Sequence, residues 1–211
     1  MVNRKIVRVK RSSKYSDRII IHLDDKNVFR IPEDVFVSNP LHVGETVSLQ
    51  KIAAYGKKMR LQEARDSAFK LLGFRMRSIA EMKKRLTEKD YDPEEIEKTI
   101  QYLTDRKYLN DKEFGKAFVK EKVKNKKIGP RALKSEIYPH HLSPELIDSL
   151  IDDIYDEFDQ NHLIETHLIK RKIEKHKPLN HKEKNRLTSF LQRKGFGWET
   201  IIDVYHDWGL I

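Results

Sequence analysis

The chain of 211 residues contains no cysteine. Without thiols it cannot form a disulfide framework, cysteine-ligated zinc, an iron–sulfur cluster or a cysteine nucleophile. No stretch approaches the roughly 18 consecutive apolar residues of a membrane-spanning helix. Residues 1–18 also lack the apolar core of a secretory signal. We therefore expect a cytoplasmic protein that makes no contact with the membrane.

Glycine and proline are also scarce, with 8 and 7 residues. Their scarcity, together with abundant Lys, Glu, Leu and Ile, favours helices over a β-sandwich or barrel. Apolar residues make up only 38% of the chain and charged residues 36%. This balance predicts an extended body with much solvated charged surface. Because apolar residues recur regularly to the end of the chain, disorder is not expected.

The motifs of common catalytic and nucleotide-binding sites are missing. GxxxxGK[ST], GxGxxG, GxSxG and HExxH do not occur. Among the nine histidines, His140 and His141 are adjacent and point apart, and His162 and His167 are five residues apart, which does not suit a helical ligand pair. We therefore expect surface histidines, no metal, no cofactor, no catalytic residue and no enzymatic activity.

The first 50 residues predict a β-rich N-terminal extension. Three runs rich in β-branched residues, at 6–10, 18–23 and 28–31, are typical of strands, and residues 24–27 supply turn chemistry between the last two. A small antiparallel sheet of two successive hairpins is the simplest interpretation. Residues 32–37 suit one helical turn, since proline is favoured at the first helical position.

From residue 51 the pattern is helical, with about nine helices, and its breaks repeat. An apolar anchor at Leu86, Ile137 or Leu191 is followed five residues later by Tyr91, Leu142 or Phe196, and seven residues later by a helix start at Pro93, Pro144 or Trp198. A period near 50 residues predicts three tandem three-helix repeats, at 51–109, 110–159 and 160–211. Because such a short unit has little core of its own, stacking predicts an elongated, curved body.

Three runs occur together in an order that resembles the RecX family. They are RSIAEMKKRL at 77–86, YLNDKEFG at 108–115 and KIGPRALKSEI at 127–137. Residues 1–50 are similar to the N-terminal extension of longer members. The sequence departs from the family pattern at Asn110–Asp111, where an acidic pair is usual, at Gly115, where alanine is usual, and at Pro139.

This resemblance implies a bacterial regulator of the RecA recombinase, with a role in DNA repair, homologous recombination and the SOS response. It implies a non-catalytic modulator, and more specifically an inhibitor. Such a protein binds in the groove of the RecA–single-stranded-DNA filament and damps ATPase, strand exchange and co-protease activity. The implied partners are the RecA filament and single-stranded DNA, touched directly or through the filament, and we expect a monomer.

Two basic clusters are the candidate contacts with RecA or DNA. Lys116, Lys120, Lys124 and Lys127 have 4-4-3 spacing and should share a helical face, which Arg131 and Lys134 extend. The second cluster is Arg75, Arg77, Lys83 and Lys84. The alternative interpretation is an ordinary solvated helix face. Ser78 within the second cluster is expected to cap a helix, with Glu81 completing a capping box.

Three other groups of residues leave alternatives open. Residues 145–159 hold seven acids and no base, which either complement helix dipoles or repel DNA phosphates. The basic N-terminal sheet either contacts nucleic acid or protects strand edges; its residues are Arg4, Lys5, Arg8, Lys10, Arg11, Lys14, Tyr15 and Arg18. Phe196, Trp198, Tyr205 and Trp208 should form the core of the last repeat.

Two rival functions remain from the residues alone. A helix-turn-helix-like module acting directly on nucleic acid needs base-reading Arg, Asn or Gln on a recognition helix. The second and third helices of each repeat carry mostly Lys, Glu and Asp, which counts against it. A scaffold that binds only protein would show partner binding that depends weakly on salt.

Overall fold

The computed structural model describes residues 3–12 and 18–211, so Lys14 and Tyr15 of the basic N-terminal segment lie outside the described residues. Two compact units are present. Unit 1 holds the residues up to Arg75 together with Met82–Arg106, and unit 2 holds Met76–Glu81 together with Lys107–Ile211. The repeat limits at 50, 109 and 159 and the elongated, curved body stay predictions.

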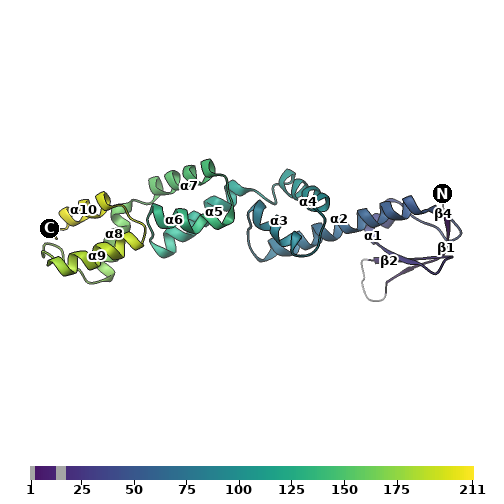
Figure 1. Cartoon of the computed structure of the whole chain (residues 1–211), viewed down its shortest axis with the longest axis horizontal. Coiled ribbons are helices and arrows are strands. Elements are labelled where there is room, and N and C mark those ends of the chain that lie inside the picture. The colour runs from purple at the N-terminus through teal and green to yellow at the C-terminus, as the bar shows by residue number, and fades with distance from the viewer. Residues whose placement is uncertain (1–2, 13–17) are drawn as a thin grey trace. The chain divides into compact units, whose positions relative to one another are not determined.

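Unit 1 contains the predicted antiparallel sheet. Its strands are β1 (Asn3–Arg11), β2 (Arg18–Leu23), β3 (Val28–Pro32) and β4 (Thr46–Ser48), in the order β3-β2-β1-β4. The two successive hairpins β1-β2 and β2-β3 are confirmed. The predicted helical turn after Pro32 is also present, as α1 (Glu33–Ser38) (Figure 1).

One face of this sheet is buried. Ile19, Ile21 and Leu23 alternate along β2 and point into a core that Ile6 and Ile31 complete. Helix α2 (Leu49–Phe74) packs against β3 and β4. One face of the sheet is therefore covered by α2, and α1 also contacts β2 and β3.

Helix α2 is long, with 26 residues, and it ends at Phe74, directly after Gly73. It packs against both the sheet and α4 (Pro93–Asp105).

The helices from α2 to the end of the chain confirm the three predicted three-helix repeats. The triplets are α2–α4, α5–α7 and α8–α10 (Figure 1). The remaining bounds are α3 (Ile79–Thr87), α5 (Asp111–Lys126), α6 (Pro130–Ile137), α7 (Pro144–Glu157), α8 (Gln160–Lys170), α9 (His181–Arg193) and α10 (Trp198–Asp207), with a 3-10 turn, η1 (Tyr138–His140), after α6. The third helices begin at Pro93, Pro144 and Trp198, as the repeat pattern predicts.

The repeated break has a common backbone cause. Four residues after each anchor the chain adopts positive φ, at Asp90 (60°), His141 (54°) and Gly195 (93°). Such a residue ends a helix and lets the following apolar side chain fold back. Accordingly, the N–H of Tyr91 donates to the Leu86 carbonyl at 3.3 Å, and that of Phe196 to the Leu191 carbonyl at 3.2 Å. The sequence period is therefore a repeated helix cap.

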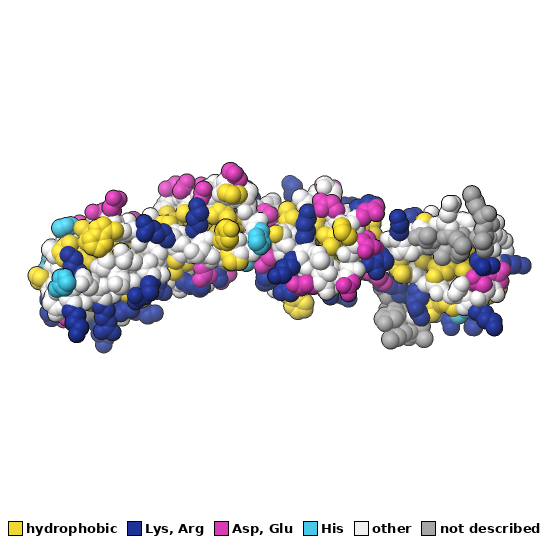
Figure 2. All heavy atoms as spheres, viewed as in Figure 1, with side chains coloured by type: hydrophobic (Ala, Val, Ile, Leu, Met, Phe, Trp, Pro, Cys, Tyr) yellow, Lys and Arg dark blue, Asp and Glu magenta, His cyan; other side chains and the backbone are white. Residues whose placement is uncertain are grey.

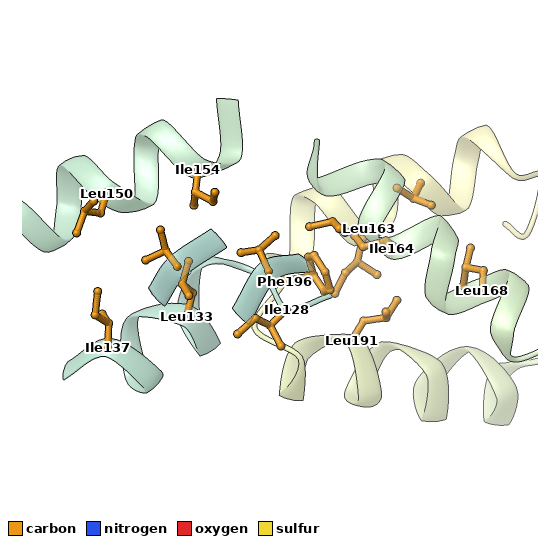
Figure 3. Packing of buried hydrophobic residues seen from close by; sticks show 14 of the residues in the cluster. Ile128, Leu133, Ile137, Leu150, Ile154, Leu163, Ile164, Leu168, Leu191 and Phe196 are labelled. Carbon is orange, nitrogen blue, oxygen red and sulfur yellow. The ribbon is translucent and has the colours of Figure 1, made fainter. Parts of the chain in front are cut away.

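The second and third repeats share one core within unit 2. A single cluster of buried residues runs from Phe114 to Leu210. Figure 3 shows Ile128 and Phe196 between side chains of α6 and α7 on one side and those of α8 and α9 on the other. Phe196 and Tyr205 are fully buried, as predicted for the last repeat, but Trp198 is 52% exposed and does not belong to that core. Trp198 begins α10, where its side chain faces away from the cluster.

A close backbone contact joins these two repeats. The Gly129 N–H donates to the Lys194 carbonyl at 2.8 Å, and the Arg131 N–H to the Gly195 carbonyl at 3.2 Å. The free N–H groups at the start of α6 are thus satisfied by the free carbonyls after α9. A Cβ on Gly129 would lie 2.6 Å from the Gly195 carbonyl carbon, and a Cβ on Gly195 2.3 Å from the Ala132 nitrogen. Only glycine permits this approach.

The equivalent position one repeat earlier makes a similar contact within unit 2. The Ser78 hydroxyl donates to the His140 carbonyl at 2.8 Å and accepts from the Glu81 N–H at 3.1 Å. The predicted cap at Ser78 is therefore confirmed. The N–H of Ile79 donates to an Asp111 carboxylate oxygen at 2.8 Å, and burial raises the pKa of this carboxyl. At Ser78 a side-chain hydroxyl therefore donates to a carbonyl at the end of another repeat's helix, as the backbone N–H does at Gly129.

We expect Gly195→Ala to destabilise unit 2 by at least about 3 kcal/mol. Positive φ costs an ordinary residue about 1–2 kcal/mol, and the added methyl group must also displace backbone atoms of α6. Urea unfolding followed by tryptophan fluorescence measures the change, because both tryptophans, Trp198 and Trp208, lie in unit 2.

The matched control is Gly197→Ala in the same unit, where φ is −69° and a Cβ would lie 3.7 Å from the Thr200 hydroxyl, an ordinary van der Waals contact. This change should alter the free energy of unfolding by less than about 1 kcal/mol. Equal stability of Gly195→Ala and the wild-type chain would show that the two backbones do not touch at this point.

Candidate partner-binding surfaces

The basic row of the second repeat lies on α5. Asn110 begins this helix, its side-chain oxygen accepting the N–H groups of Lys112 at 3.0 Å and Glu113 at 3.2 Å. Lys116, Lys120 and Lys124 follow at four-residue spacing and are exposed. Lys127 does not continue this face, contrary to the prediction. It has φ of 50° and ends the helix, so the 3.6-residue period stops before it.

Two of the predicted basic contacts are paired with acids of the same unit. Lys120 Nζ lies 2.6 Å from a Glu157 oxygen, and Lys134 Nζ lies 2.6 Å from an Asp148 oxygen. The basic run and the acidic run, which the sequence analysis treated as separate surfaces, therefore meet between α5, α6 and α7. Both pairs are about half-exposed, so each is worth at most about 1 kcal/mol.

The other basic side chains of this surface differ in their partners. Lys126 lies 2.5 Å from Glu136, and this hydrogen bond holds the pKa of the Glu136 carboxyl below its usual value. Among residues 3–12 and 18–211, no acidic oxygen lies within 4 Å of the charged atoms of Lys116, Lys124 or Arg131. These three cations are the ones available to an external partner.

The acids of α7 form a surface of their own. Asp152, Asp153 and Asp156 are exposed, and Figure 2 shows acidic side chains gathered over α7. Whether these acids repel DNA phosphates stays a prediction. The structure adds that two members of the acidic run, Asp148 and Glu157, are held by lysines.

A third basic surface was missed in the sequence analysis. It covers α9 and the segment before it, and Figure 2 shows basic side chains gathered there. Its residues, defined here as the α9 surface, are Lys170, Arg171, Lys172, Lys175, Lys182, Lys184, Arg186, Arg193 and Lys194. Arg171 stacks over the Phe190 ring at 3.7 Å. The available signal was the 10 basic and 6 acidic side chains of residues 160–211.

The first-repeat cluster is spread over two segments. Arg75 and Arg77 lie between α2 and α3, with Arg75 exposed and Arg77 half-buried. Lys83 on α3 lies 2.8 Å from Glu97 on α4, and Lys84 is exposed. Lys84 is therefore the member of this cluster on α3 that points to solvent.

Two histidines are packed inside unit 2, contrary to the expectation of surface histidines. His140 Nδ1 lies 2.9 Å from a Glu81 oxygen, and its ring packs against Phe114 and Phe118. His167 is 8% exposed, and its Nε2 donates to the Lys127 carbonyl at 2.7 Å. In the described part of the chain, no group of three or more His, Asp or Glu is placed to hold a metal ion.

Burial lowers the pKa of His167, and the hydrogen bond to the Lys127 carbonyl opposes this effect only in part. The nearby charges of Lys194 and Arg171 lower the pKa further. His167 thus acts as a neutral hydrogen-bond donor that fixes the end of α5 against α8.

Comparison with known proteins supplies the family context. Residues 64–103 match a model described as the first three-helix domain of RecX, and residues 166–204 match the third. Regulatory protein RecX of Bacillus subtilis (strain 168) is 32% identical over 196 residues, which cover 93% of this chain and 74% of that protein. Regulatory protein RecX of Clostridium botulinum (strain Alaska E43 / Type E3) is 25% identical over 201 residues, covering 95% and 94%.

Solved structures show the same fold. A crystal structure of regulatory protein RecX superposes with a TM-score of 0.73 at 21% identity, covering 96% of this chain and 97% of that one. RecX from Lactobacillus salivarius gives a TM-score of 0.62 at 18% identity, covering 72% and 98%. Among the described helices, none is long and apolar enough to cross a membrane.

We expect unit 2 to lose stability as the pH falls below about 6.5 because His167 must become protonated as the chain unfolds. The folded pKa lies below the unfolded value of about 6.5, so the unfolded chain binds more protons in this range. The stability that His167 contributes in this way is complete above pH 6.5 and decreases as the pH falls towards the pKa of His167 in the folded chain. Urea unfolding at several pH values measures it.

His167→Gln keeps a side-chain N–H donor but cannot titrate, so its stability should depend less on pH than that of the wild-type chain. His206→Gln changes an exposed histidine of the same unit and should leave the pH dependence in place. The same slope in the wild-type chain and His167→Gln would show that His167 is not the titrating group.

Proposed function

This chain belongs to the RecX family of regulatory proteins, and from that premise we propose that it is a non-catalytic modulator of RecA. It acts as an inhibitor that binds in the groove of the RecA–single-stranded-DNA filament. By occupying the groove it damps ATPase, strand exchange and co-protease activity. The observation that carries the proposal is the relation to a curated regulatory protein RecX over 93% of the chain.

The charged surfaces of unit 2 support binding to an assembly of protein and nucleic acid. Exposed acids lie over α7, whereas the α9 surface and the lysine row of α5 are basic. A partner that presents both signs of charge suits this separation better than bare nucleic acid, which presents one. The groove of a RecA filament offers protein side chains and DNA phosphates side by side.

Within this proposal the cations differ in how readily they reach the partner. Lys116, Lys124 and Arg131 of unit 2 are candidates for direct contact, as is exposed Lys84 of unit 1. Lys120 and Lys134 first have to release Glu157 and Asp148. Because exposed pairs are weak, this exchange costs little.

The α9 surface favours a second candidate function, direct binding to DNA. Nine cations with little acidic charge among them suit phosphate contacts. This function predicts tight binding to bare DNA that weakens steeply with salt, in the absence of RecA.

The first test is the DNA-dependent ATPase of RecA with sub-stoichiometric amounts of the chain, beside binding to bare single-stranded DNA in the same salt. We expect suppressed ATPase and weak binding to bare DNA, because the assembled filament is the target. Unchanged ATPase together with tight DNA binding would contradict the proposal and support the second candidate.

The double variant Lys116→Gln/Lys124→Gln should raise the concentration needed for half-inhibition by about tenfold, because it removes two available cations from the surface. Helix content, measured by circular dichroism, should not change. The control Lys70→Gln/Lys89→Gln removes the same charge from exposed positions outside the candidate clusters. Equal inhibition by both variants would exclude the α5 row as the contact.

A further inference from the structure

The N-terminal sheet has an outer face that faces away from its core. Because partners in an antiparallel ladder point to the same side, residues paired with the outward positions of β2 share this face. Arg8 pairs with His22 and Lys10 pairs with Ile20. On the other side of β2, Val28 pairs with His22 and Arg30 with Ile20. Lys5 joins them through its pairing with exposed Thr46 of β4.

The basic residues of this unit fall into two groups. Arg4 is 2.8 Å from Asp25, Arg11 contacts Glu33, and Arg18 is 3.5 Å from Glu63. These three cations therefore have acidic partners within the unit.

The outer-face cations do not. Lys5, Arg8, Lys10 and Arg30 are exposed. Throughout the described chain, no acidic oxygen lies within 4 Å of their charged atoms. The eight residues that these pairings place on the outer face, Lys5, Arg8, Lys10, Ile20, His22, Val28, Arg30 and Thr46, include no acid.

Such a face is unfavourable without an anionic partner. Lys10 and Arg30 pair with Ile20 from the strands on its two sides, so their Cα atoms are separated by about 10 Å. Arg8 lies two residues before Lys10 on β1, on the same face of the sheet. Like charges this close repel one another, and the repulsion is only partly screened at physiological salt. Edge protection does not account for Lys5, because β4 and the backbone of Asp24 both hydrogen-bond to that part of β1.

We propose that this outer face binds the phosphate backbone of a nucleic-acid strand. Four cations spread over three strands match a flexible chain of phosphates, and displaced counterions favour the complex. His22 supplies the ring on this face on which a base could stack, and stacking tolerates every base, so binding is independent of sequence. The site is separate from the surfaces proposed to contact RecA and does not depend on that function.

The test measures binding of the full-length chain to a mixed-sequence single-stranded DNA oligonucleotide by fluorescence anisotropy over a range of salt concentrations, without RecA. The variant is Arg8→Gln/Lys10→Gln/Arg30→Gln. Each phosphate contact contributes about 0.7 to the slope of log affinity against log salt, so loss of three contacts should make the slope shallower by about 2. The charge-retaining variant Arg8→Lys/Lys10→Arg/Arg30→Lys should keep the wild-type slope.

The matched control Lys57→Gln/Lys58→Gln/Lys70→Gln removes the same charge from exposed positions on α2 and should leave the slope unchanged. Circular dichroism checks the sheet, and if the triple Gln variant does not fold, Lys10→Gln alone should make the slope shallower by about 0.7. Equal slopes for the wild-type and Gln variants would overturn the proposal. So would an equal loss of slope in the control.

Discussion

The direct contact between the backbones of Gly129 and Gly195 is the constraint on which unit 2 depends. Two sets of groups that a helix leaves unsatisfied, the first N–H groups of α6 and the last carbonyls after α9, satisfy each other there. No side chain fits between them. The contact therefore sets how the second and third repeats meet, and the continuous core around Ile128 and Phe196 forms beside it. As a result, the charged side chains of the second and third repeats belong to the surface of one compact unit.

The same structure decides which charges remain available. Lys120 on α5 and Lys134 on α6 are held by Glu157 and Asp148, whereas no acidic oxygen of the described residues lies within 4 Å of Lys116 or Lys124 on α5. The sheet makes a similar division between Arg4, which has an acidic partner, and the outer-face cations, which have none among residues 3–12 and 18–211. Net charge alone is thus a poor guide to function, because some of the cations are paired with acids of the same unit. The cations left over mark the surfaces where a partner gains most from binding.

Several elements could be predicted because their signals are local. The strands at 18–23 and 28–31, the helix starts at Pro93, Pro144 and Trp198, and the cap at Ser78 depend on neighbouring residues in the sequence. The burial of His167 and the exposure of Trp198 could not be foreseen, since each depends on residues far along the chain.

By itself the sequence determined the β-rich extension, the three repeats and the family resemblance. These features come from turn chemistry, hydrophobic periodicity and motif order, which act over a few residues. Only the tertiary structure decided that Lys127 leaves the basic face and that the acidic and basic runs meet. Ion pairing and surface clustering depend on distances in space between elements. Those distances are fixed by packing and by the glycine contact rather than by spacing along the chain.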